Sequence, residues 1–169
     1  LPDVLRRYVK KHPSNRIRLL DASSHEVRES VLNGQAEVGI AISGEKHEAL
    51  TEHLLFEDPL VFICQTPHPL QHKKSVTWRD MREADLIAVS SFMATRVVMD
   101  YQLSKRGIRL QGNYEVQHHA TAINLVAAGV GDAILPSSTF RVGDRPGVCK
   151  VPIVNPSVKR KVVLLQRKN

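Results

Sequence analysis

Polar and aromatic side chains follow the apolar segments of this sequence, at points where strands are expected to end. Ligands of open α/β sheets bind beyond the carboxyl ends of the strands, so these positions are candidates for a binding site. Simpler roles compete with binding, such as a serine that caps a helix, a histidine at a helix entry, or an isoleucine that packs. The candidates are Ile42, Ser43, Ser90, Ser91, Phe92, His118, His119, Pro136 and Ser137.

The same side chains do not form a recognisable catalytic set. The sequence has no nucleophile–base–acid group, no glycine-rich phosphate loop followed by lysine, and no carboxylate pair with catalytic spacing. We therefore predict a binding protein without a cofactor, and not an enzyme. His118 and His119 are adjacent, and neighbours on a helix point in different directions, which argues against a shared metal.

Two cysteines lie in separate apolar segments. Cys64 is in "LVFICQ" and Cys149 is in "GVCKVP", and neither belongs to a CxxC or metal-binding pattern. Buried reduced thiols are the favoured interpretation, with a redox pair as the alternative.

Composition indicates a soluble globular chain. Of 169 residues, 42% are hydrophobic and 24% are charged, and no apolar run approaches the ~20 residues that span a bilayer. The net charge is +7, but the basic residues are scattered and aromatics make up only 5%, which disfavours direct nucleic-acid binding by this segment. The chain opens without Met or a signal peptide, so we expect a piece of a longer, cytoplasmic protein.

Hydrophobic periodicity predicts alternating helices and strands, as in an α/β protein with a parallel sheet. Ser23 and Glu26 form an expected capping box, Gly34 is an expected helix stop, and the segment 38–42 is expected to be buried on both faces. Helices are expected at 2–11, 23–33, 77–83, 94–107 and 118–129, and strands at 17–22, 38–42, 59–65, 85–90, 108–116, 133–136, 147–154 and 161–166.

Two parts of the chain resemble each other. The segment "SVLNGQAEVGIAI" matches "NLVAAGVGDAILP", which places Gly34 on Gly129 and Glu37 on Asp132 at one offset (129 − 34 = 95, 132 − 37 = 95). We expect two similar lobes, Gly131 close to the sheet, and Asp132 accepting backbone N–H groups. The strand 59–65 would lead out of the first lobe and 147–154 back, with 161–166 as a final strand of that lobe. Two crossings predict a hinged pair with a ligand cleft.

Four motifs in register resemble the effector-binding domain of LysR-type transcriptional regulators. They are "LPDVLRRYVKKHP", "VLNGQAEVGIAI", "EDPLVFICQTPHPL" and "NLVAAGVGDAILP", and together they cover essentially the whole chain. Glu37 stands where the family usually has aspartate, and Asp132 where an aliphatic residue is more common. The family's winged helix-turn-helix, its opening strand with a serine/threonine loop, and its last helix have no counterpart in this sequence.

The resemblance implies a periplasmic-binding-protein-like α/β fold of type 2, with two Rossmann-like lobes joined by two crossover strands. The first lobe would comprise 1–62 and 147–169, and the second 63–146. An inducer pocket would lie in the cleft. The resemblance adds Thr95 and Arg96 to the candidate binding residues. They lie at the start of an expected helix, whose free N–H groups suit a carboxylate or other anion.

The predicted function is ligand sensing and dimerisation for a LysR-type transcription factor that contacts DNA only through another domain. A solute-binding protein for uptake, an enzyme on the same scaffold and a thiol sensor are the alternatives. The resemblance also implies antiparallel homodimers, which could pair into tetramers. The apolar part of their interface would contain Tyr8, Val9, Val97, Val98 and Tyr101.

Overall fold

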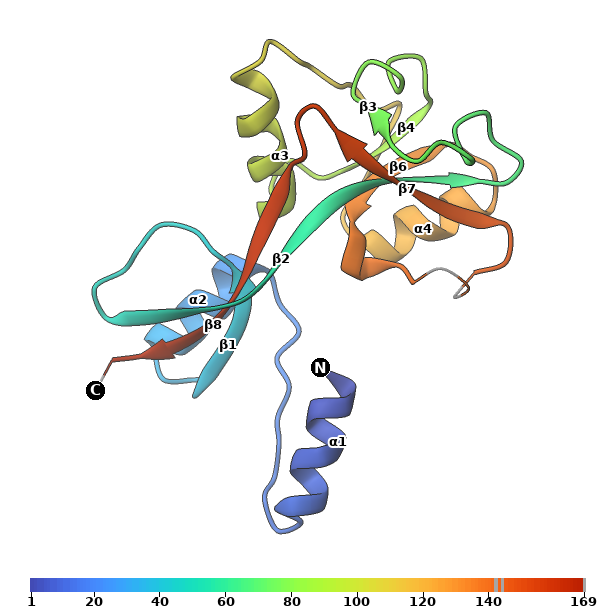
Figure 1. Cartoon of the computed structure of the whole chain (residues 1–169). Helices are drawn as coiled ribbons and strands as arrows, with labels where there is room; N and C mark the ends of the chain where they lie inside the picture. Colours follow the sequence, from blue (N-terminus) through green and yellow to red (C-terminus); the bar gives the residue numbers. More distant parts are fainter. Residues whose placement is uncertain (142, 144, 169) are drawn as a thin grey trace.

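The computed structural model describes residues 1–141, 143 and 145–168. Its strands form a mixed sheet in the order β1-β8-β2-β6-β4-β5, with β7 pairing with β2 and β3 (Figure 1). None of the helices in this part of the chain is long and apolar enough to cross a membrane. The elements are α1 (Pro2–Lys11), α2 (Ser24–Leu32), β1 (Val38–Ile42), β2 (Leu50–Gln65), β3 (Val76–Thr77), β4 (Leu86–Val89), α3 (Ala94–Ser104), β5 (Tyr114–Val116), α4 (His119–Ala127), β6 (Asp132–Pro136), the 3-10 turn η1 (Ser137–Thr139), β7 (Val148–Val154) and β8 (Lys159–Arg167).

Two long strands connect the two halves of the molecule. The first part of β2 pairs antiparallel with β8, from Leu50 opposite Arg167 to Pro59 opposite Lys159. The last part of β2 pairs with β6 and β7. On the other side of β8, β1 completes the smaller half together with α2. The ribbon in Figure 1 accordingly narrows to β2 and β8 between a small and a large body.

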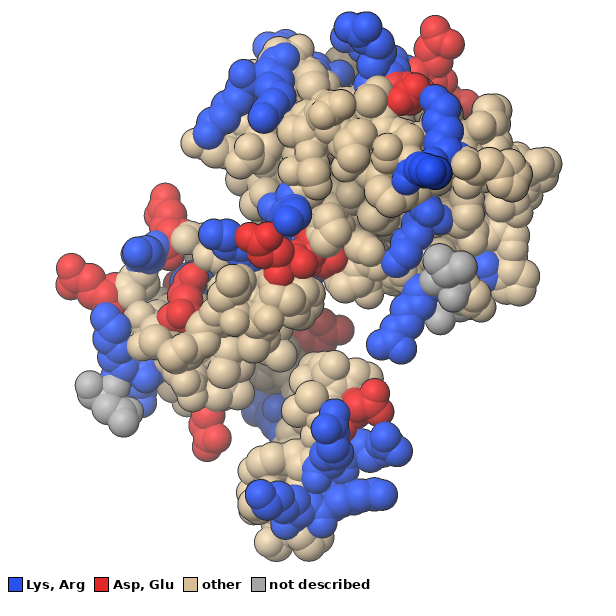
Figure 2. Space-filling model, in the orientation of Figure 1, with Lys and Arg blue, Asp and Glu red and all other residues tan. Residues whose placement is uncertain are grey.

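α1 stands apart from both bodies. Figure 1 shows it below the sheet, joined to α2 by an extended segment, and none of its residues is buried. Asp3 in its first turn and lysines in its last turn suit the helix dipole. Figure 2 shows basic side chains gathered over this helix, which carries Arg6, Arg7, Lys10 and Lys11.

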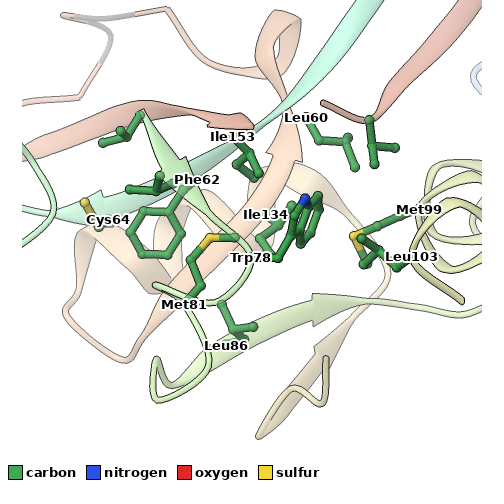
Figure 3. Close-up of a cluster of buried hydrophobic side chains, with 13 residues drawn as sticks. Leu60, Phe62, Cys64, Trp78, Met81, Leu86, Met99, Leu103, Ile134 and Ile153 are labelled. Atoms are coloured by element: carbon green, nitrogen blue, oxygen red, sulfur yellow. The ribbon is translucent and has the colours of Figure 1, made fainter. Parts of the chain in front are cut away.

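Alternate residues of β2 supply two separate hydrophobic cores of the larger half. Leu60, Phe62 and Cys64 face a cluster that contains Trp78 and Met81 (Figure 3). Val61 and Ile63 face the opposite side, where α4 packs. The smaller half has its own core of Val31, Ala41, Leu50, Val163 and Leu165. Because successive side chains of a strand point to opposite faces, β2 contributes to both cores of the larger half.

The predicted ends of α2 are confirmed. The Ser23 hydroxyl accepts from the backbone N–H of Glu26, and the Glu26 carboxylate accepts from the N–H of Ser23, as in a capping box. Gly34 follows the helix with a φ of +70°, which suits glycine. Gly129 has the corresponding place after α4, with a φ of +74°. The two helices also begin and end 95 residues apart (119 − 24 = 95, 127 − 32 = 95), which supports the internal correspondence.

Three predicted elements differ from the structure. Residues 17–22 form no strand, because no described strand lies beside them, and Ile17, Leu19 and Leu20 are exposed. In place of the helix predicted at 77–83, Thr77 ends β3 and residues 78–83 form turns, which let both Trp78 and Met81 enter the core. The expected strand 108–116 is reduced to β5, three residues long.

β1 is buried on one face only, and not on both as predicted. Gly39 and Ala41 are buried, whereas Val38 and Ile40 are 51% and 45% exposed. A methyl group on Gly39 would lie 2.6 Å from a Val27 methyl, which shows how closely α2 covers that face. α2 packs on this face of β1, and the side chains that point to the opposite face, Val38 and Ile40, remain exposed.

The sheet is mixed, whereas alternating helices and strands predicted a parallel one. β4 is parallel to both β5 and β6, but every pairing that involves β2 or β8 is antiparallel. The predicted strand 147–154 is present as β7, but the prediction that it leads back to the first lobe is wrong. β7 stays beside the last part of β2 and beside β3, and β8 makes the return. The prediction that 161–166 pairs in the first half is confirmed.

Candidate functional site

A buried ion pair lies where the two connecting strands meet the larger half. Asp58 of β2 and Arg160 of β8 are directly opposite in the ladder. The Arg160 Nε and Nη2 atoms donate to Asp58 Oδ2 at 3.0 and 2.9 Å. The Asp58 side chain is 2% exposed and that of Arg160 12%. Each charge of this pair needs its partner, because a buried charge without one strongly lowers the stability of the fold.

Two further elements bring hydroxyl groups to this ion pair. Arg160 Nη1 donates to the Thr95 hydroxyl at 2.9 Å, which places the start of α3 beside β8. The Ser138 hydroxyl and backbone N–H of η1 donate to the two Asp58 oxygens at 2.6 and 3.0 Å. Lys150 holds the same turn by donating to the carbonyl oxygens of Ser137 and Phe140. The two strands, α3 and η1 therefore converge on one polar cluster, Asp58, Thr95, Ser138 and Arg160.

His119, the first residue of α4, completes the surroundings of this cluster. Its Nε2 atom is buried and has no hydrogen-bond partner. Burial first and then the positive charge of Arg160 lower the pKa of His119, and with the opposing effect of Asp58 included it is about 4. The imidazole is therefore neutral near pH 7 and retains an unused donor or acceptor nitrogen.

The helices that reach the polar cluster have open N-terminal ends. Neither Met93, the N-cap of α3, nor His118, the N-cap of α4, makes a side-chain capping bond. The first N–H groups of a helix carry partial positive charge and suit an anion. Because Asp58 already neutralises Arg160 and accepts the Ser138 hydroxyl proton, these N–H groups and the Thr95 hydroxyl are the groups best placed to hold an anionic ligand.

The smaller half offers a second polar group at the end of β1. The Ser43 hydroxyl donates to Glu52 at 2.8 Å, and Arg28 Nη2 donates to the other Glu52 oxygen at 2.8 Å. The Arg28 Nη1 atom is buried without a partner. Ile42, the preceding residue, pairs with Val162, and its backbone N–H donates to Ser24. Ile42 is therefore a packing residue here, and Ser43 belongs to a charge network.

The structure brings only some of the predicted candidates to the polar cluster. Thr95 is a direct member and His119 adjoins it. Pro136 is buried and caps η1, whose Ser138 is a member, and Ser90 is buried where β4 meets α3. Ser91, Phe92 and His118 are exposed, with Phe92 at 95%.

The side chain of Arg96 donates its hydrogen bonds to residues outside the polar cluster. Its Nε donates to both Asp100 oxygens at 2.9 and 2.8 Å, and its Nη1 donates to the Val89 carbonyl at 3.3 Å. It lines a hollow of about 20 Å³ with Gly112 and Met99, enough for a single water. The predicted role of Arg96 as the anchor of an anion thus has no geometric support in this conformation.

Asp132 has a different partner from the one expected. Its carboxylate lies 3.3 Å from His68 Nε2 and is not bonded to a backbone N–H among the described contacts. Its own N–H donates to the Asp85 carbonyl. Burial raises the pKa of Asp132, and the nearby His68 opposes that rise. The residue joins the 68–70 turn to the start of β6, and it has no contact with the polar cluster.

The sequence reasoning missed Asp58, Arg160 and Ser138, which are central members of the polar cluster. A weak signal existed for Asp58, since "EDPLVF" places an acid directly before an apolar strand, where a buried charge needs a partner. Arg160 stands in the basic run "VKRKVV" and is not distinguishable there from its exposed neighbours. The pairing of β2 with β8 selects it.

A comparison with protein families decides the classification. A sequence model of the LysR substrate binding domain matches residues 1–169. The chain belongs to the LysR substrate-binding domain family. Among its relatives, the uncharacterized HTH-type transcriptional regulator YbhD of Escherichia coli (strain K12) is 27% identical over 169 residues, or 100% of this chain and 53% of YbhD. AlsR of Bacillus subtilis (strain 168) is 33% identical over 144 residues, or 84% of this chain and 48% of AlsR.

Solved structures of LysR regulators share the fold. The BenM effector binding domain with benzoate has a TM-score of 0.83 at 23% identity, covering 100% of this chain and 78% of that one. The CcmR regulatory domain from Synechocystis PCC6803 with 2-PG has a TM-score of 0.87 at 18% identity, covering 99% and 81%. The predicted type 2 periplasmic-binding-protein-like fold is confirmed. This LysR-family chain spans about half the length of the curated relatives it matches.

Proposed function

We propose that this chain is the effector-sensing and dimerising regulatory domain of a LysR-type transcription factor. The observation that carries the proposal is the polar cluster Asp58, Thr95, Ser138 and Arg160, with the unpartnered His119 nitrogen beside it. These residues come from both connecting strands, from the starts of α3 and α4, and from η1. A ligand at this point would contact the larger half next to both connecting strands, where two lobes would move relative to each other on closure.

The effector that suits this cluster is a small carboxylate or another anion. Open helix N-termini and hydroxyl donors favour negative charge, and the neutral His119 adds one uncharged hydrogen-bonding group. Related structures hold benzoate, 2-PG and shikimate. The proposed contacts are Ser90, Thr95, His119 and the Pro136–Ser137 backbone, with Ser43 as the contribution of the smaller half.

The proposed mechanism is a shift in lobe closure that is passed to DNA-binding domains outside this chain. An effector acts only through its different affinities for the two arrangements, and couplings of about 1–3 kcal/mol are typical. The protein would be cytoplasmic, would contact DNA through those other domains, and would not catalyse a reaction. Uptake of a solute is the less favoured alternative, because the relatives named above are transcriptional regulators.

A thermal-shift screen of small carboxylates tests the proposal, starting with benzoate, 2-PG and shikimate. A ligand at a hundredfold excess over its Kd should stabilise the chain by about 2.7 kcal/mol, or roughly 5–10 °C in Tm. Thr95→Val should reduce that shift, whereas Ser91→Ala, which removes an exposed hydroxyl nearby, should leave it unchanged. A panel without any stabilising anion, or equal shifts in both variants, would contradict the proposed site.

A further inference from the structure

Two cysteines outside the polar cluster lie directly opposite each other in the sheet. Cys64 of β2 pairs with Cys149 of β7 in the antiparallel ladder. Their Sγ atoms are 3.2 Å apart, close enough for one thiol to hydrogen-bond to the other. Both are free thiols. They are 85 positions apart in the sequence and lie together because β2 pairs with β7.

The backbone already has the spacing that a disulfide requires. Residues directly opposite in an antiparallel pair have Cα atoms roughly 4.5–5.5 Å apart, within the range of about 4.4–6.8 Å found across disulfides. Bond formation would bring the two sulfurs to about 2 Å, a movement of about 1 Å that small side-chain rotations can supply. No strand has to shift, because the register of β2 and β7 is already correct.

The two thiols differ in access to solvent. Cys64 is fully buried beside Phe62 in the core shown in Figure 3, whereas Cys149 is only partly buried at its edge. Burial raises the pKa of Cys64, as do the Cys149 thiol and the Asp132 carboxylate. A small oxidant therefore meets Cys149 first, and Cys64 is the second thiol to react.

We propose that Cys64 and Cys149 form a reversible dithiol–disulfide site that a peroxide oxidises. The Cys149 thiolate attacks one peroxide oxygen, the O–O bond breaks, and the departing hydroxide takes a proton to become water, leaving a sulfenic acid. The Cys64 sulfur then attacks the Cys149 sulfur, the S–O bond breaks, and the second hydroxide takes the Cys64 proton. Two thiols are oxidised to one disulfide while the peroxide is reduced to two waters.

The bond would lock the larger half of the molecule. The loop that it closes contains β3, β4, α3, β5, α4, β6 and η1. One end of the link is on β2, the strand that also carries Asp58 toward the smaller half. This site goes beyond effector binding, since neither cysteine contacts the polar cluster in any described interaction.

Mass spectrometry of the chain after treatment with excess hydrogen peroxide tests the proposal. The intact mass should fall by about 2 Da, and a non-reduced digest should contain a peptide that links Cys64 to Cys149. The Tm should rise by roughly 5–15 °C, because the link closes a long loop, and dithiothreitol should reverse both changes.

Single-cysteine variants provide the control. Cys149→Ser removes the partly exposed thiol and is expected to fold, so it should show neither the mass loss nor the peroxide-dependent rise in Tm. Cys64→Ala removes the buried thiol and should likewise show neither the mass loss nor the rise in Tm. The proposal is overturned if the wild-type chain keeps both thiols titratable after peroxide, if Cys149 gains oxygen without forming the link, or if the link forms only between two chains.

Discussion

The Asp58 carboxylate and the Arg160 guanidinium meet at 2.9 Å across two strands that are neighbours in the ladder. The pair is the point at which elements from distant parts of the sequence are fastened together, since Thr95 bonds to the arginine and Ser138 to the aspartate. A change in either partner is therefore expected to disturb both the stability of the chain and the arrangement of the proposed binding site.

Arg160→Met should lower the free energy of unfolding by about 3–5 kcal/mol, because it leaves the Asp58 charge buried and unpaired. Urea denaturation measures this change. Asp58→Asn combined with Arg160→Met should cost less than the sum of the single changes, since neither charge then remains. Additive effects in this double-mutant cycle would show that the two side chains do not interact.

His119 should make the stability of the chain depend on pH in the mildly acidic range. Its folded pKa of about 4 lies below the ordinary value of 6.5, so the unfolded chain binds more protons between these pH values. The contribution of the neutral imidazole is complete above about pH 6.5 and is lost as the pH falls toward 4. The loss should reach roughly 2–3 kcal/mol by unfolding measurements at successive pH values.

His119→Gln isolates that contribution from the other titrating groups. Asp132, whose pKa is raised, acts in the opposite sense but is present in both proteins and cancels from their difference. His118→Gln is the matched control, because this neighbouring histidine is exposed. An identical pH dependence in wild type and His119→Gln would refute the assignment of a buried neutral imidazole.

Local patterns in the sequence were enough to predict most elements of the fold. The capping box at Ser23 and the glycine after α2 depend on neighbouring residues, and both are present. The errors arose where tertiary context decides. The segment 77–83 has helical spacing, but in the structure a series of turns places Trp78 and Met81 in the core. The segment 17–22 is apolar, yet a strand forms only beside another strand.

The candidate site was harder to predict because its central contacts are non-local. Thr95 and His119 lie at helix entries, which the expected topology selects. Asp58 and Arg160 are 102 residues apart, and only the pairing of β2 with β8 brings them together. Arg96 shows the opposite problem, since its position on α3 was correct but its side chain is bonded to Asp100.

Thr95→Val should weaken effector binding, whereas Arg96→Ala should not. Thr95 is buried in the polar cluster, and its loss should weaken an anionic effector roughly tenfold, the value of one hydrogen bond. Arg96→Ala should leave the affinity unchanged and should cost only about 0.3–0.5 kcal/mol of stability for its i,i+4 pair with Asp100. Calorimetric titration measures both affinities. A strong loss of binding in Arg96→Ala would restore that arginine to the site.

A charge on the exposed apolar face of α3 should prevent dimerisation. Tyr8 and Val9 on α1 and Val97 and Tyr101 on α3 are all at least 42% exposed, which suits the proposed interface. Val98, the remaining residue of the predicted interface, is partly buried and packs against the core of the larger half. Val97→Glu should weaken self-association at least tenfold, because a carboxylate would be desolvated there.

Sedimentation measurements at several concentrations would report the change. Phe92→Glu is the control, since Phe92 is more exposed than Val97 but lies outside the proposed interface. A monomeric wild-type chain, or equal weakening by both substitutions, would contradict this interface.

Gly131→Ala should be more damaging than an alanine at most other glycines. A methyl group on Gly131 would overlap the backbone carbonyl oxygen of Asp85, which cannot rotate away. That oxygen also accepts the N–H of Asp132 at 2.8 Å, where β6 begins beside β4. We expect a loss of roughly 1–3 kcal/mol in the free energy of unfolding, from overpacking and from disturbance of this bond.

Gly44→Ala provides the comparison for this close approach. An added methyl there would lie 3.5 Å from the nearest atom, Arg28 Nη2, which is ordinary contact. Its effect should be close to zero or slightly stabilising, because alanine restricts the unfolded chain. If both variants unfold at the same urea concentration, β6 and β4 do not approach each other at Gly131 as closely as the structure has them.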